Sequence, residues 1–290
     1  MEKKSLNEIS DISETLLIPL YSRAAESQTE NPILIDKKAV DITKELNKIL
    51  KNSDSSLHQV LVKGKVRGKL GKKLNVTLCL RTRKFDSYCN SFLEKNPDGI
   101  IIELGCGLST RFSRIDNKKL MWFDLDFPEV IDIRKSFFEE TDRYHFIASS
   151  VLDFNWMKKI QHNNKKILFI AEGLLMYLQK EKVKDLILKL QKTFPGCEIA
   201  CEVANTFVIK MLKRKIWRKK FQRDFHFGKD VLFYFGISDS RDFEKWNQGI
   251  TFLDDWTYFD DKEKKLGWIN IFGRSKKFSK TQWIVHYLLK

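Results

Sequence analysis

A short apolar run that leads into a Gly-x-Gly turn is the feature of this sequence that most constrains its fold. Residues Ile100–Leu104 have the length and composition of a buried strand, and Gly105 and Gly107 follow directly. A second apolar stretch ends in Asp124 and Asp126 about twenty residues further on. Glycines allow a sharp turn close to a ligand, and a carboxylate at the tip of the next strand accepts hydrogen bonds from ribose hydroxyls. The pattern predicts an α/β fold with a nucleotide-cofactor site.

The third glycine of a dinucleotide-binding fingerprint is missing from this turn. Thr110 stands at its position. A pyrophosphate packed on the N-terminus of a helix needs the close approach which that glycine allows. S-adenosylmethionine contains ribose and adenine but no phosphate, so the shortened motif favours it over NAD as the cofactor.

Composition limits the class of protein. The chain has 290 residues, of which 42% are hydrophobic and 22 are Phe, and this indicates an ordered globular protein. No apolar run approaches the roughly 18–20 residues that span a bilayer, and we see no hydrophobic signal block, so we expect a cytoplasmic protein with no membrane partner. The five cysteines are scattered without a Cys-x-x-Cys pair, which predicts reduced thiols and no metal site.

The formal charge of +15 raises the alternative of a nucleic-acid partner. Basic residues cluster at 63–73 and at 210–220. No recognised RNA- or DNA-binding motif accompanies them, so we favour lysine-rich solvated surfaces over nucleic-acid binding.

From residue 99 onward, strand-like and helix-like segments alternate, which predicts a mostly parallel sheet covered on both faces. The expected strands are 100–104, 120–124, 144–148, 166–171 and 198–203, with helices at 128–140, 154–161 and 180–193. Near the C-terminus, 268–272 and 282–289 are expected to form an antiparallel pair.

The sequence divides into two expected parts. Residues 1–98 are predicted to form a helical N-terminal cap with its best helix at 74–94, and 99–290 to form the cofactor-binding core. An aromatic and basic insertion at about 205–248 is a candidate lid and acceptor-selecting segment.

Four patches of sequence carry a family resemblance: Arg81–Asp86, Glu103–Arg114, Phe123–Val130 and Ala171–Leu178. In this order and spacing, the chain resembles the leucine carboxyl methyltransferase family, in particular its bacterial branch of polyketide O-methyltransferases. The segment Tyr21–Ala24 also resembles that branch. The resemblance implies a class I, Rossmann-like methyltransferase that uses S-adenosylmethionine. Where the family usually has Asp after Gly-x-Gly-Leu, this chain has Ser109, which can still cap a helix.

The resemblance also implies which residues bind the cofactor. Arg81 or Arg83 would clamp the methionyl carboxylate with a guanidinium fork, and the family spacing favours Arg81. Gly105 and Gly107 would bring the backbone close to the ligand, and Glu103 belongs to the same cofactor-binding patch.

Further cofactor contacts are implied at the ends of the next strands. Asp126 resembles the ribose ligand, and Asp124 is the alternative because strand alternation sends both side chains to the same face. Asp153 resembles the acceptor for the adenine amine, with Leu152 as its apolar neighbour, although Asp153 could instead cap the following helix. Glu172 would lie beside the methionine moiety.

The sequence offers candidates for catalysis, not an assignment. They are Glu172, Tyr177 and His226, and His286 is the other histidine considered near the substrate. An ionised carboxylate acceptor needs no general base, whereas a phenol or an alcohol does. The resemblance implies an O-methyltransferase for a small molecule, either a carboxylate or a polyketide-type hydroxyl. The alternatives are a nucleic-acid-binding protein or RNA methyltransferase, and a cofactor-binding scaffold without activity.

Overall fold

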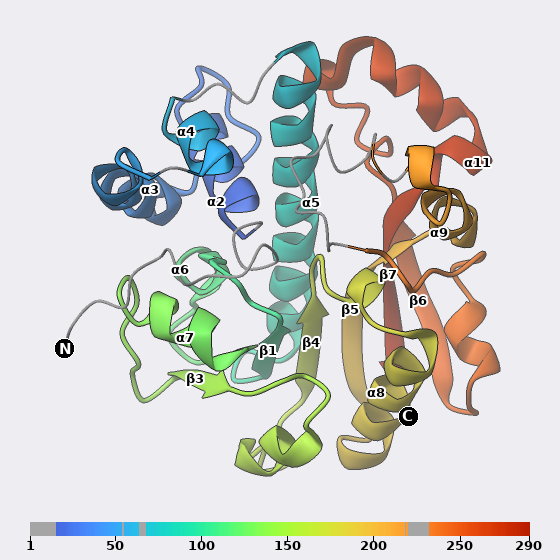
Figure 1. Cartoon of the computed structure of the whole chain (residues 1–290). Helices are drawn as coiled ribbons and strands as arrows, with labels where there is room; N and C mark the ends of the chain where they lie inside the picture. The colour runs from blue at the N-terminus through green and yellow to red at the C-terminus, as the bar shows by residue number, and fades with distance from the viewer. Residues whose placement is uncertain (1–15, 54, 64–67, 218, 220–231) are drawn as a thin grey trace.

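A seven-stranded sheet forms the centre of the computed structural model, which describes residues 16–53, 55–63, 68–217, 219 and 232–290 (Figure 1). The strands are β1 (Ile100–Leu104), β2 (Met121–Asp126), β3 (Tyr144–Ala148), β4 (Ile167–Ala171), β5 (Cys197–Ala204), β6 (Ile250–Trp256) and β7 (Gln282–Leu289). Their order across the sheet is β3-β2-β1-β4-β5-β7-β6. Strands β1 to β5 pair in parallel, and β7 is antiparallel to β5 and β6. The predicted Rossmann-like sheet with a C-terminal antiparallel pair is confirmed.

The central strands are apolar throughout because both faces of the sheet are covered. On β1, Ile101 belongs to a core shared with the N-terminal helices. Ile100 and Ile102 belong to a second core on the opposite face, which α8 (Lys180–Thr193) helps to close with Leu186 and its neighbours. Full burial of each such side chain contributes about 1.5–3 kcal/mol, so the sheet is held from both sides.

Four helices precede the sheet: α2 (Leu17–Glu26), α3 (Lys37–Leu50), α4 (Ser56–Val62) and α5 (Gly68–Lys95). Helix α5, which contains the predicted helix 74–94, runs beside α2 and contacts β4 of the sheet (Figure 1). Asp36 caps α3 by accepting a hydrogen bond from the Ala39 backbone at 2.9 Å. These helices share one apolar core with the sheet, so they pack directly on it.

Shorter helices connect the strands: α6 (Arg111–Ile115), α7 (Pro128–Arg134), η2 (Phe154–Lys159), η3 (Leu175–Tyr177), α9 (Thr206–Leu212), η4 (Asp242–Lys245), η5 (Lys264–Arg274) and α11 (Lys276–Ser279). The helix predicted over 128–140 ends at Arg134, whose carbonyl accepts from the N–H groups of Phe137 and Phe138. The chain turns there and buries the Phe138 ring. The segment predicted over 154–161 is the 3-10 helix η2.

The strand predicted at 268–272 is wrong. These residues belong to η5, and the strand that pairs with β7 is β6. The side chain of Trp268 is 69% exposed, so this apolar stretch does not lie inside a sheet. The sequence pattern does not predict strand β6, because its register shifts between Phe252 and Asp254 and the shift breaks the apolar alternation.

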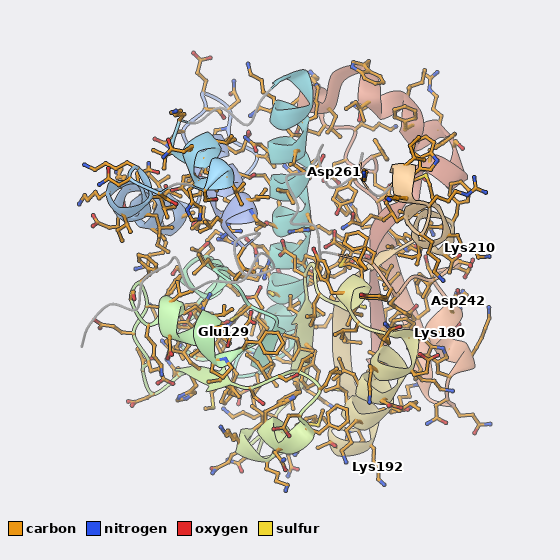
Figure 2. All side chains as sticks on the ribbon, viewed as in Figure 1. Glu129, Lys180, Lys192, Lys210, Asp242 and Asp261 are labelled. Atoms are coloured by element: carbon orange, nitrogen blue, oxygen red, sulfur yellow. The ribbon has the colours of Figure 1, made fainter. Side chains whose placement is uncertain are left out.

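The described helices include none that is long and apolar enough to cross a membrane. Among the same residues, no cluster of His, Cys, Asp or Glu could hold a metal ion. All five cysteines are buried and unpaired. Exposed lysines such as Lys180, Lys192 and Lys210 point outward at the edge of the molecule (Figure 2), as expected for a solvated basic surface.

Candidate functional site

A cavity of about 380 Å³ is lined by residues from α2, from α5 and from the carboxyl ends of the parallel strands with the loops that follow them. Its size falls in the range of small-molecule sites. Apolar side chains from α2, α5 and the loops after β1, β2 and β4 form much of its wall. Its polar lining residues include Arg23, Arg81, Glu103, Ser109, Asp126, Ser149, Ser150, Glu172 and Tyr177.

The Gly-x-Gly turn forms the floor of this cavity. Gly105 and Gly107 have φ values of +66° and +49°, which residues with a Cβ rarely adopt. A Cβ on Gly105 would come within 3.0 Å of Leu174, and a Cβ on Gly107 within 3.0 Å of Leu16. Both glycines line the cavity, so the turn brings bare backbone to its surface.

Asp126 lies at the tip of β2 and faces the cavity. Its Oδ2 accepts a hydrogen bond from the Gly107 N–H at 2.8 Å, and its Oδ1 accepts from the Phe127 N–H at 2.8 Å. Burial raises the pKa of Asp126, although these two backbone hydrogen bonds oppose the change. The backbone therefore fixes the carboxylate while further lone pairs are left for a ligand hydroxyl.

Asp124 does not line the cavity. It lies two residues deeper in β2 and is fully buried, where it accepts hydrogen bonds from Trp122 at 2.8 Å and from Tyr144 at 2.5 Å. Its ion-pair partner is Arg134, which donates to the carbonyl of Gly107 at 2.7 Å. The shared strand face does bring both aspartates to the same side, but α7 covers the deeper one. Asp124 supports the glycine turn from behind.

On the other side of the turn, a buried ion network lines the cavity. The Arg81 Nε donates to Glu172 at 2.8 Å, and Glu172 also pairs with Arg111. Arg111 contacts Glu103 as well and donates to Asp86 at 2.8 Å. Charges from α5, α6, β1 and the end of β4 are thus brought together in one place.

Two carboxyl groups of the network, those of Glu172 and Glu103, have shifted pKa values. Burial alone would raise the pKa of Glu172, but Arg81 and Arg111 bring it down to about 2. Burial raises the pKa of Glu103 to about 7, against the opposing effect of Arg111. Glu172 is therefore a fixed negative charge and a poor proton acceptor at neutral pH.

Arg23 is a cavity residue to which the sequence analysis gave no role. It lies on α2, its Nε donates to Asp36 at 2.9 Å and its Nη2 donates to the Leu108 carbonyl at 2.9 Å. Burial lowers the pKa of Arg23, while Asp36 opposes the change. Arg23 belongs to the Tyr21–Ala24 patch that resembles the family. Nothing in the sequence, however, indicates that α2 packs against the glycine turn.

Besides Asp124, two further predicted cofactor residues lie outside the cavity. Arg83 pairs with Asp261 at 2.8 Å, and Figure 2 shows Asp261 alongside α5. Asp153 caps η2 by accepting from the Asn155 N–H at 3.2 Å. Its neighbour Leu152 does line the cavity, so the loop after β3 contributes Leu152 to the wall but not the Asp153 carboxylate.

Of the remaining catalytic candidates, one lines the cavity, one does not, and one is not described. Tyr177 lines the cavity, and burial raises its pKa to about 12. His286 lies on β7, pairs with Glu198 at 2.8 Å and is not a lining residue. His226 lies outside the residues that the structure describes.

The predicted lid at 205–248 reaches the site indirectly. The part of it that the structure describes contributes no residue to the cavity wall. Its residue Phe233 does contact Tyr177, and the two rings pack edge-on with their centroids 5.2 Å apart. The Tyr234 N–H also donates to the Met176 carbonyl at 2.8 Å. Its described end thus supports one wall of the cavity from behind.

Comparisons with known proteins agree with this geometry. Residues 17–191 match the model of the leucine carboxyl methyltransferase family. The chain is 23% identical over 253 residues to the tetracenomycin polyketide synthesis O-methyltransferase TcmP of Streptomyces glaucescens, covering 87% of this chain and 85% of that protein. It is 27% identical over 206 residues to an S-adenosyl-L-methionine-dependent methyltransferase of Gibberella zeae, covering 66% and 64%. The crystal structure of a DUF574 family protein from Streptomyces avermitilis superposes with a TM-score of 0.57 at 8% identity, covering 86% of this chain and 97% of that one, which supports the fold alone.

Proposed function

Because the chain belongs to the leucine carboxyl methyltransferase family, we propose that it transfers a methyl group from S-adenosylmethionine to an oxygen of a small acidic molecule. Family membership confirms the enzyme class and the cofactor that the sequence predicted. The choice of an oxygen acceptor is supported by the likeness to an O-methyltransferase. The choice of a carboxylate is argued from the cavity.

The residues around the cavity fit the cofactor. Asp126 offers a fixed carboxylate beside the glycine turn, as ribose hydroxyls require. Across the turn, Arg81 and Arg23 offer guanidinium groups to a carboxylate such as that of the methionine moiety. Glu172, whose pKa is lowered, adds a fixed negative charge nearby, which favours a sulfonium. This pairing of a ribose-type carboxylate with buried arginines is the observation that carries the proposal.

The bound cofactor would supply a methyl group on a sulfonium, which is already an excellent leaving group. What remains for this chain is to align the acceptor and to exclude water. No histidine among the described residues lines the cavity, and Tyr177 is a neutral phenol at physiological pH. The two lining glutamates, Glu172 and Glu103, are both held in ion pairs with Arg111. An acceptor that is already ionised, such as a carboxylate, suits a site without a free general base.

Calorimetry and methyl transfer test the proposal in two steps. We expect micromolar binding of S-adenosylmethionine and of S-adenosylhomocysteine, and transfer of labelled methyl to members of a panel of small carboxylic acids. A panel of phenols and a bulk RNA sample serve as alternatives. No binding by the folded protein would refute the cofactor site. Transfer only to phenols would refute the carboxylate, and transfer only to RNA would favour the alternative that rests on the charge of +15.

A further inference from the structure

Two carboxylates hold Arg81, and they stand in different positions relative to the cavity. The Arg81 Nε donates to Glu172 at 2.8 Å, and its Nη1 donates to Glu202 at 3.0 Å. Glu172 lines the cavity. Glu202, on β5, is not a lining residue, and its side chain is fully buried. Glu202 therefore meets Arg81 from the side that faces away from a ligand.

The hydrogen-bonding capacity of Glu202 is fully used inside the protein. Besides Arg81, its Oε2 accepts from the Gly173 N–H at 2.9 Å. Its Oε1 accepts from the Tyr258 hydroxyl and from the Gln282 side-chain amide, the latter at 2.6 Å. An ionised carboxylate offers about four acceptor sites, and four donors occupy them here. Glu202 has no site left for a cofactor or substrate, so any effect on the ligand passes through Arg81.

The arrangement fixes both the charge and the direction of the guanidinium. Burial opposes the charged form of Arg81, but Glu202 and Glu172 more than offset this and raise its pKa above the usual value. With Nε and Nη1 both engaged, the planar group cannot rotate. Its remaining nitrogen, Nη2, has no hydrogen-bond partner among the described residues, and Arg81 lines the cavity.

We propose that Glu202 is a positioning residue that aims the Arg81 guanidinium at the carboxylate of S-adenosylmethionine. This inference rests on the proposed function. Tyr258 and Gln282 hold Glu202, and all three lie beyond the 17–191 segment that matches the family model. Gln282 begins β7, and Tyr258 follows β6 by two residues. The C-terminal antiparallel pair thus supports the cofactor site as well as closing the sheet.

The test compares two ligands that differ at one end. S-adenosylhomocysteine has the amino-acid carboxylate, whereas 5′-methylthioadenosine keeps the adenine, the ribose and the sulfur but lacks it. In Glu202→Gln, calorimetry should show a Kd for S-adenosylhomocysteine raised about tenfold, the scale of one hydrogen bond to a charged group. The Kd for 5′-methylthioadenosine should change by less than about twofold. A role in folding alone would weaken both ligands together.

Glu198→Gln is the matched control on the same strand. Glu198 pairs with His286 at 2.8 Å and does not line the cavity, so neither Kd should change. If Glu202→Gln does not fold, Tyr258→Phe removes one of the four donors and should give a smaller change in the same direction. An unchanged Kd for S-adenosylhomocysteine, or an equal rise for both ligands, would overturn the positioning role. Wild-type protein that binds neither ligand would instead refute the proposed function.

Discussion

The two sides of the cavity are built in different ways. On the β2 side, Asp126 and Gly107 meet across 19 residues of sequence, and the binding groups are one carboxylate and the backbone. On the β4 side, Arg81 and Glu202 are 121 residues apart, and the binding groups are buried side chains that ion pairs hold in place. Strand β1 lies between β2 and β4, so the glycine turn separates the two sides. Local spacing can specify the first side, whereas the second exists only after the chain has folded.

This difference predicts that the β4 side is the costlier one to disrupt. Arg111 is buried and pairs with Asp86, Glu103 and Glu172. Arg111→Met would leave those carboxylates without their shared cation, and the free energy of unfolding should fall by about 3–5 kcal/mol. Urea unfolding followed by tryptophan fluorescence measures the loss. Arg143→Met, which breaks the more exposed pair with Asp116, is the control and should change stability little. Similar small losses in both variants would show that the buried network contributes little to stability.

The β4 side should also make stability depend on acid pH. The pKa of Glu172 in the folded protein is about 2, below its ordinary value of 4.5. Its stabilising contribution is complete above pH 4.5 and is lost as the pH falls toward 2. At about 1.4 kcal/mol per unit, the loss is about 3 kcal/mol. The unfolding free energy of the wild type should therefore fall more steeply than that of Glu172→Gln in this window, and parallel curves would contradict the lowered pKa.

On the β2 side, we expect binding and stability to separate. Asp126→Ala should weaken S-adenosylhomocysteine binding by about 1–3 kcal/mol, since it removes hydrogen bonds to a charged group, and the fold should persist. Asp124→Ala should mainly lower the free energy of unfolding, because it leaves Arg134 buried without its ion-pair partner. Calorimetry and urea unfolding on both variants distinguish the roles. If Asp124→Ala gives a stably folded protein with the larger binding defect, our assignment of the two aspartates is reversed.

How far the sequence could predict the molecule follows the same division. The strands 100–104 and 144–148 and the helix 180–193 have the predicted bounds, because burial on the sheet sets their apolar pattern. Strand β6 was missed because its register shift hides that periodicity. An exposed apolar stretch at 268–272 was mistaken for it.

The candidate site shows the same limit. Asp126 and the glycines follow from a local motif, and the structure places them on the cavity. The motif could not exclude Asp124, because one strand face carries both and only the packing of α7 separates them. Glu202 carries no motif, and its partners Tyr258 and Gln282 are distant in sequence. Long-range ion pairs of this kind leave no local pattern to find.

Within the Arg-x-Arg patch, Arg83 gives the smallest expected effect, and its comparison with Arg81 is the most direct one. Residues two apart on a helix are related by a rotation of about 200° and so point in nearly opposite directions at 3.6 residues per turn. Arg81 accordingly faces the cavity, while Arg83 pairs with Asp261 at 2.8 Å. That pair is partly exposed, with 40% of the Arg83 side chain accessible. Arg83→Ala should thus cost about 0.2–1 kcal/mol of stability and leave the Kd of S-adenosylhomocysteine unchanged. Arg81→Ala should raise that Kd, and that of S-adenosylmethionine, by the equivalent of about 1.5–3 kcal/mol. Equal effects of both substitutions on binding would mean that Arg81 does not face the cofactor more closely than Arg83 does. Arg81 would then no longer distinguish the β4 side of the cavity from the β2 side.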